Sequence, residues 1–211
     1  MHFPAHHPDT FDFLSDIRNR FKPDLIVSVG DETELAGLSF HDKDPDALSP
    51  GHEYKEALMC MRKLYKLFPK MRICISNHGS RLYRKAFNSG IPRNLVKCYQ
   101  DLWEAPDDYI WEQRIIIDDV LYIHGDPGAG RNLGFKAMQD YKMSIVHGHV
   151  HSHGGVQYHN TSLGQTFWMN TGCMVDVNSP VFGYGEKYAT KPTLGCGVVV
   201  DGKIAHFLPM V

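Results

Sequence analysis

The feature that most constrains this chain is a short apolar run followed by closely spaced histidines. Residues Ser144 to Val146 are typical of a buried strand, and Gly148 ends the run. His149 and His151 follow at alternate positions, so in an extended segment both imidazoles would leave the same face and converge on one point. Neutral imidazole is a common ligand for zinc, manganese and iron. The end of this strand is therefore a candidate metal site.

The spacing alone does not identify the ligands. The chain has 13 histidines among 211 residues, so about one His-x-His pair is expected from composition by chance. His147 and His153 have the same parity as His149 and His151, and any of the four could be a surface or core histidine. The choice among them depends on partners elsewhere in the chain.

Length and composition favour one domain over residues 1–211. An apolar content of 43% is enough for a core, and the formal charge of −2 argues against a strongly basic coat for nucleic acid. No apolar run approaches the ~20 residues that span a bilayer, and the first residues do not resemble a signal peptide. The five scattered cysteines indicate reduced thiols. We therefore expect a cytoplasmic protein without a membrane partner.

Apolar periodicity predicts alternating helices and strands in the first two thirds of the chain and short strands in the last third. The expected helices are residues 10–21, 49–68, 80–88, 94–102 and 132–141. The expected strands are residues 25–29, 71–75, 115–117, 120–123, 144–146, 156–158, 167–170, 197–200 and 205–208. The polar stretch 32–50 is expected to be a functional loop. This order predicts an α/β sandwich with two sheets.

Four of the expected strands end on residues that can bind a metal. These ends are Gly30-Asp31, Asn77-His78, His124-Gly125 and Gly148-His149-Val150-His151. Because the carboxyl ends of strands in one sheet gather at one edge, these residues can meet. One carboxylate, one amide oxygen and several imidazoles suit manganese, iron or zinc, whereas calcium or magnesium would require more oxygen ligands.

In this order the four motifs resemble the calcineurin-like metallophosphoesterase superfamily, and more closely its compact phage and prophage members. The likeness runs from His2 to the C-terminus, and residues 76–86 and 192–199 carry its closer part. The resemblance implies an α/β/β/α sandwich of two sheets, with a metal site at the C-terminal ends of the strands. It also implies hydrolysis of a phosphodiester or nucleotide-type phosphoester by a metal-bridging hydroxide. Two alternatives stay open, a phage-type DNA nuclease of the same family and a degenerate metal-binding protein without turnover.

The resemblance further implies two divalent metals, with manganese preferred and iron, zinc or nickel as alternatives. The implied metal ligands are His2, Asp31, Asn77, His124, His149 and His151. Asp31 would bridge the two metals and thereby share in catalysis. Asn77, His124 and His149 would complete one site, and the other would use His2 and His151.

The remaining implied roles concern the substrate, a phosphoester that includes nucleotides and nucleic acids as candidates. His78 would contact it and protonate or stabilise the leaving oxygen. Arg81 and Arg84 could hold a second phosphate or a nucleic-acid backbone, and the alternative for both is a solvated helix face. The sequence does not indicate an oligomeric state.

The chain departs from the family pattern at three places. The family motif Asp-x-His would need an aspartate two residues before His2, on a strand that is also expected to be missing, so the site with His2 and His151 is expected to be weakly occupied. The family's Asn-His-Asp or Asn-His-Glu is Asn77-His78-Gly79 here, so no neighbouring carboxylate is expected to orient His78. The family's Gly-Asp-x-x-Asp ends in Glu34.

Overall fold

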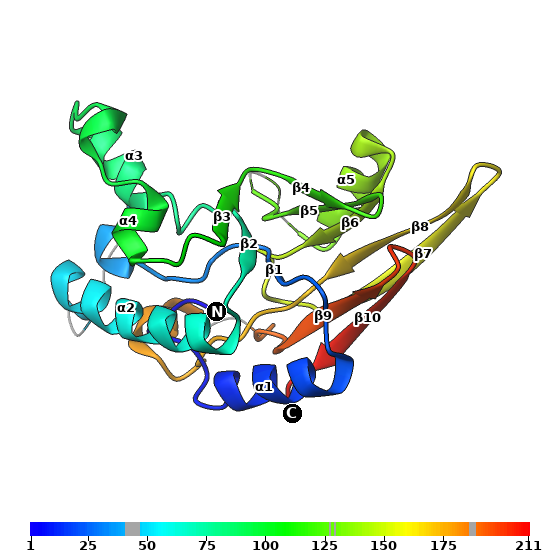
Figure 1. Ribbon diagram of the computed structural model, residues 1–211, viewed down its shortest axis with the longest axis horizontal. Helices are drawn as coiled ribbons and strands as arrows, with labels where there is room; N and C mark the ends of the chain where they lie inside the picture. The colour runs from blue at the N-terminus through cyan, green and yellow to red at the C-terminus, as the bar shows by residue number, and fades with distance from the viewer. Residues whose placement is uncertain (41–46, 127, 129, 186–188) are drawn as a thin grey trace.

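The structure is a computed structural model that describes residues 1–40, 47–126, 128, 130–185 and 189–211 (Figure 1). Residues 41–46, the centre of the expected functional loop, lie outside the described residues. Among the described residues, no helix has both the length and the apolar content that crossing a membrane requires.

The chain folds as an α/β protein with mixed sheets, as the sequence predicts. The helices are α1 (Thr10–Phe21), η1 (Ala36–Leu38), α2 (Pro50–Leu67), α3 (Arg81–Asn88), η2 (Arg93–Leu95), α4 (Tyr99–Trp103), α5 (Leu133–Tyr141) and η3 (Pro180–Gly185). The strands are β1 (Val27–Ser28), β2 (Met71–Cys74), β3 (Tyr109–Glu112), β4 (Ile115–Ile117), β5 (Val120–Ile123), β6 (Ser144–His147), β7 (Gly155–Thr161), β8 (Gly164–Asn170), β9 (Gly195–Val200) and β10 (Ile204–Pro209).

The described strands form three hydrogen-bonded sheets, where two were expected. Strands β1, β2 and β3 form a parallel sheet in that order. A five-stranded mixed sheet has the order β4-β5-β6-β8-β7, and β9 pairs with β10 as an antiparallel hairpin. Strand β10 lies against β7 and β8 (Figure 1). The arrangement is compatible with an α/β sandwich whose second layer is divided in two.

Helix α2 anchors one face of the three-stranded sheet. Ser49 caps it by accepting a hydrogen bond from the backbone N–H of His52, and Pro50 occupies the first turn. The buried residues Ala57, Met61 and Leu64 belong to the same apolar cluster as Ile73 of β2. Burying this face at roughly 25 cal/mol per Å² of apolar surface is the main force holding helix and sheet together. The helix expected over residues 49–68 is thus present.

Two local predictions failed between α3 and β4. Residues 94–102 are not one helix, because the chain becomes extended at Val96 and the Cys98 side chain caps a new helix at Tyr99. Strand β3 was not among the predicted strands. It is fixed by parallel pairing with β2 and by a two-bond ion pair in which Arg72 Nε and Nη2 each lie 2.8 Å from a Glu112 oxygen.

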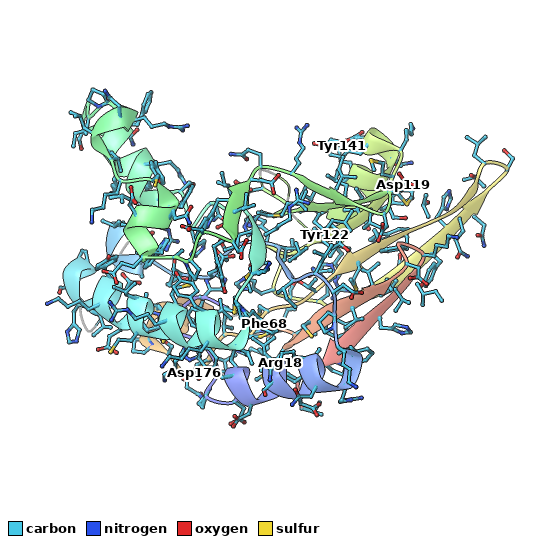
Figure 2. All side chains as sticks on the ribbon, in the orientation of Figure 1. Arg18, Phe68, Asp119, Tyr122, Tyr141 and Asp176 are labelled. Atoms are coloured by element: carbon cyan, nitrogen blue, oxygen red, sulfur yellow. The ribbon has the colours of Figure 1, made fainter. Side chains whose placement is uncertain are left out.

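A cavity of about 240 Å³ lies between β1, β6, β9 and α1. Its lining is largely apolar and includes Val29 and Val199, and Arg18, Phe68 and Tyr122, labelled in Figure 2, also belong to it. Within the described residues, β1 pairs only with β2 and β9 only with β10, so each keeps one unpaired edge. Unpaired edges leave backbone N–H and C=O groups without sheet partners.

Candidate metal centre

Asp31 lies at the centre of the candidate site. It is buried, follows the end of β1, and adopts a left-handed backbone conformation with φ of 56°. Its backbone N–H donates to Ser76 Oγ at 3.0 Å, and its Oδ1 accepts from the backbone N–H of His78 at 3.3 Å. These contacts tie Asp31 to the segment that follows β2.

Two groups of potential metal ligands share Asp31. One contains Asp31, His124 and His149, the other contains His2, Asp31 and His78, and the ligand atoms within each group lie within 4.8 Å of one another. The four strand ends therefore do meet, as the sequence predicted. They belong to two different sheets, however, and not to the edge of one sheet.

The first group is positioned by a hydrogen bond between the sheets. His124 Nδ1 donates to the Val29 carbonyl at 2.8 Å, so its Nε2 faces inward, 3.4 Å from Asp31 Oδ2. Asn77 Oδ1 lies 2.7 Å and His149 Nδ1 lies 3.2 Å from the same Nε2. The structure therefore brings these four side chains together, and their role as metal ligands stays a prediction.

The second group has the same construction. His2 Nδ1 donates to Glu34 Oε2 at 2.5 Å, so its Nε2 faces Asp31 Oδ2 at 3.5 Å and His151 Nε2 at 3.0 Å. His2 is almost fully buried, with 1% of its surface exposed. Its backbone N–H donates to the Asp31 carbonyl at 2.7 Å, and Phe3 pairs with Thr33. Main-chain hydrogen bonds therefore hold His2 at the site.

His149 and His151 reach different groups because the chain turns between them. Strand β6 ends at His147, and His149 is left-handed with φ of 66°. The expectation that both imidazoles leave one face of an extended segment is therefore wrong. His149 turns toward His124 and His151 toward His2, so the pair spans both sides of Asp31.

The two other histidines of this stretch lie outside both groups. His147 is fully buried on β6, where its Nδ1 bonds the Gly148 carbonyl, and burial lowers its pKa to about 4. His153 lies 3.3 Å from the side chain of Asn170. The alternate spacing of the four histidines could not distinguish these two from the site residues. Burial of His147 on β6 and the turn at His149 depend on the tertiary structure.

Glu34 is the functional residue that sequence reasoning missed. Its Oε2 lies 3.1 Å from His78 Nδ1, so the expectation that His78 lacks an orienting carboxylate is wrong. The same carboxylate binds His2, and its Oε1 accepts from Arg81 Nη1 at 2.9 Å. Its place at the end of Gly30-Asp31-x-x-Glu34 was the available signal, but only the fold brings it to His78.

Arg81 and Arg84 lie in different environments. Arg81 is buried against Glu34, and its Nη2 lies 3.3 Å from His78 Nε2, so a solvated helix face is excluded for it. Arg84 is exposed, and its Nη1 lies 3.4 Å from the Asn77 carbonyl. Their predicted contacts with substrate stay a prediction.

Opposing effects set the ionisation of the site. Burial disfavours the charge on Asp31, but the neighbouring His78, His124 and His2 outweigh it and hold the pKa of Asp31 far below its usual range. Burial also opposes ionisation of Glu34, and hydrogen bonds from His2 and His78 lower its pKa. For His78, burial is outweighed by Asp31 and Glu34, which raise its pKa. The site therefore favours charged carboxylates.

Three of the ten non-glycine residues with positive φ in the described part of the chain are candidate ligands. His2, Asp31 and His149 all have positive φ, at 62°, 56° and 66°. A left-handed conformation costs a non-glycine residue of order 1–3 kcal/mol and persists only where the surrounding structure enforces it. At these three candidate ligands the surrounding structure therefore enforces an unfavourable backbone conformation, which fixes the direction of the side chains at a cost in local stability.

The donor set fits divalent transition metals. Since the Val29 carbonyl accepts from His124 Nδ1, the other ring nitrogen, Nε2, is directed at Asn77 Oδ1, Asp31 Oδ2 and His149 Nδ1. These four atoms converge on one place and are all of types that bind metals. Hydrogen bonds from the outer nitrogens of His2 and His124 also fix ring orientation, as is usual for ligating histidines. Imidazole, carboxylate and amide oxygen together suit manganese, iron or zinc.

Comparison with known proteins adds no family assignment. No family model matches the chain, and no curated protein is significantly similar to it. The candidate centre rests on its own geometry.

Proposed function

We propose that this protein is a metal-dependent phosphoesterase with two metal positions that share Asp31. The observation that carries the proposal is the pair of three-residue ligand groups with this carboxylate in common. One position is formed by Asp31, Asn77, His124 and His149. The other would use His2 and Asp31 together with His151, whose Nε2 lies 3.0 Å from His2 Nε2, with manganese as the preferred ion. His78, the third residue of that ligand group, is assigned to the substrate instead. Asp31 Oδ2 lies 3.4 Å from His124 Nε2 and 3.5 Å from His2 Nε2, so this carboxylate faces both groups and would be the ligand that they share.

Two adjacent divalent cations would activate water near neutral pH and stabilise the charge that develops on a phosphoryl group during displacement. The protein's own contribution is a rigid, dry set of donors. Asp31, His2 and His124 have side chains exposed by 6% or less. Low exposure strengthens each electrostatic interaction with an anionic substrate.

His78 is the residue best placed to act on the leaving oxygen. Its side chain keeps 16% exposure, more than the 1–6% of His2, Asp31 and Glu34, so it lies at the mouth of the site. Glu34 accepts the Nδ1 proton and thereby holds the ring with Nε2 toward the side where Arg81 lies. With Nδ1 held by Glu34, Nε2 is the ring nitrogen that would face the leaving oxygen.

The test is hydrolysis of bis-p-nitrophenyl phosphate by protein that has been treated with a chelator and then titrated with manganese. We expect activity to appear with added manganese and to be lost in Asp31→Asn. His206→Ala is the matched control, because His206 is exposed on β10 outside both ligand groups. Tight manganese binding with no turnover of this diester or of p-nitrophenyl phosphate would refute the proposal that the protein is an enzyme. The alternative, a metal-binding protein without turnover, would then stand.

A further inference from the structure

A segment beside the candidate centre is strongly basic in an otherwise acidic chain. Residues 75–100 contain five basic residues and no Asp or Glu, whereas the whole chain has a formal charge of −2. The basic residues are Arg81, Arg84, Lys85, Arg93 and Lys97. In Figure 1 the part of this segment from α3 to α4 projects from the rest of the molecule. This projection therefore presents positive charge to solvent.

The projection contains a groove of about 660 Å³. Its lining includes the aromatic residues Phe40, Tyr83, Phe87 and Tyr99 together with Arg84 and Arg93. Phe87 is 81% exposed and Phe40 is 43% exposed, so both offer ring surface to a ligand. Most large aromatic residues lose such exposure during folding because burial of their apolar surface is favourable.

Cations already lie over these aromatic rings. Lys85 Nζ lies 4.1 Å and Arg84 Cζ lies 4.9 Å from the centre of the Phe40 ring, and Arg93 Cζ lies 6.0 Å from the centre of Tyr83. Tyr83 is fixed by a hydrogen bond from its hydroxyl to the Lys97 carbonyl at 2.8 Å and by edge contact with Tyr99. Aromatic rings and positive charges therefore lie next to one another along the groove, and the contacts of Tyr83 hold its ring in place.

The groove begins close to the candidate centre. Ser80 lines it, and Ser80 Oγ donates to the carbonyl of Asn77 at 3.3 Å. Arg84 also reaches that carbonyl at 3.4 Å. Since Asn77 belongs to the candidate centre, a phosphate bound at Arg84 would lie beside that centre. A chain of linked phosphates could occupy both places at once.

We propose that this groove binds single-stranded nucleic acid, with phosphates at Arg84 and Arg93 and unpaired bases on the rings of Phe40 and Phe87. Aromatic platforms interleaved with cations are the usual means of holding single strands, because every base has a stacking face. Paired bases are not available for such stacking, so duplexes bind less well. Arg81 is paired with Glu34, but the four other cations of this segment have no acid beside them in residues 75–100, which favours this occupant over an apolar protein surface.

The assignment of the scissile phosphodiester to the nearby centre rests on the proposed function. Binding in the groove does not, so binding is measured separately. The experiment uses fluorescence anisotropy of labelled 12-nucleotide DNA and RNA single strands with the full chain, in chelator and at two salt concentrations. A DNA duplex of the same length is the comparison.

We expect single strands to bind more tightly than duplex, with affinity falling as salt rises. The double variant R84A/R93A should weaken binding at least tenfold and reduce the salt dependence. Phe87→Ala, at a largely exposed position, should weaken binding roughly tenfold through lost stacking. The matched control is K55A/K136A, which removes the same charge from exposed positions on α2 and α5. The difference between DNA and RNA identifies the preferred strand.

Absent binding, or equal loss in R84A/R93A and K55A/K136A, would overturn the inference. So would a dimer in sedimentation that is lost in Phe87→Ala, because a second copy would then be the occupant. Manganese-dependent hydrolysis of bis-p-nitrophenyl phosphate without binding of any oligonucleotide would overturn the proposed nucleic-acid groove and leave the phosphoesterase proposal standing. Oligonucleotide binding through the groove without hydrolysis of any phosphoester supports the groove and overturns the phosphoesterase.

Discussion

Glu34 connects three side chains of the candidate centre. It accepts hydrogen bonds from His2, His78 and Arg81, and it is buried with them. Removal of such an orienting partner typically costs about 10- to 100-fold in activity or metal affinity. The position in sequence gave no direct reason to expect this, because Glu34 is 44 residues from His78 and only the folded loop joins them.

For Glu34→Gln we therefore expect kcat for bis-p-nitrophenyl phosphate to fall by about 10- to 100-fold, because His78 loses its charged partner. Steady-state kinetics at saturating manganese measure this effect. Glu104→Gln is the control, since Glu104 carries an ion pair with Arg62 on the exposed surface. Equal activity of the two variants would show that Glu34 does not orient a working residue.

Mutagenesis can distinguish two possible roles of His78, metal ligand and general acid. It belongs geometrically to the group with His2 and Asp31, yet its proposed role is toward the leaving oxygen. We expect His78→Ala to keep its manganese and to lose turnover by roughly 10²-fold, as for a positioned general acid. Elemental analysis and kinetics on the same preparation decide the matter. Loss of manganese in parallel with turnover would make His78 a ligand instead.

At the scale of elements, the turn after β1 is the tightest part of the site. Gly30 has φ of +97°, and a Cβ there would lie 2.7 Å from both His124 Nδ1 and Ser76 Cβ. Any larger residue would push His124 away from the Val29 carbonyl. Asp31 can take its position after β1 only because the residue before it, Gly30, has no side chain.

We expect Gly30→Ala to lower the free energy of unfolding by about 1–3 kcal/mol more than Gly90→Ala does. The two glycines match in having positive φ, but a Cβ at Gly90 meets nothing within 4 Å. Comparing the two variants by urea denaturation separates the cost of steric crowding at position 30 from the cost of placing an alanine at positive φ. Equal destabilisation would mean that the turn relaxes and does not constrain His124.

Elements with strong periodicity or a clear turn were predictable. The helices starting at Thr10 and Pro50 and the hairpin of β4 and β5 are present, and Asp118 and Asp119 both take positive φ at its turn. Residues 94–102 failed because side-chain capping at Cys98 outweighs a weak apolar spacing. Candidate ligands could be found because they follow strands. Their division into two groups could not, because it depends on the turn at His149 and on two sheets meeting.

At the scale of the whole molecule, the cavity beside β1 and β9 lies next to the proposed second metal position. Met1 lines this cavity, and its amine donates to the Asp31 carbonyl at 2.9 Å. An added apolar strand that ends in Asp directly before Met1 could pair with the free edges and place a carboxylate beside His2. A peptide N–H at Met1 could keep the bond to Asp31.

We expect this extended chain to be more active than the 211-residue chain at limiting manganese, because the added carboxylate strengthens the position that His2 and His151 form. Assays of both chains side by side, with anomalous scattering to count ions, provide the measurement. An extension that ends in Asn is the matched control. Two full ions and equal activity in the shorter chain would show that another group supplies the ligand.

The most direct test of the shared carboxylate is the manganese content of purified protein at saturating manganese, measured for the original chain, Asp31→Asn, His149→Ala and His206→Ala. The original chain and His206→Ala should bind more than one ion per chain. His149→Ala should lose the ion held with His124, and Asp31→Asn should lose both, because both ligand groups contain Asp31. Unchanged stoichiometry in Asp31→Asn would contradict the proposed centre.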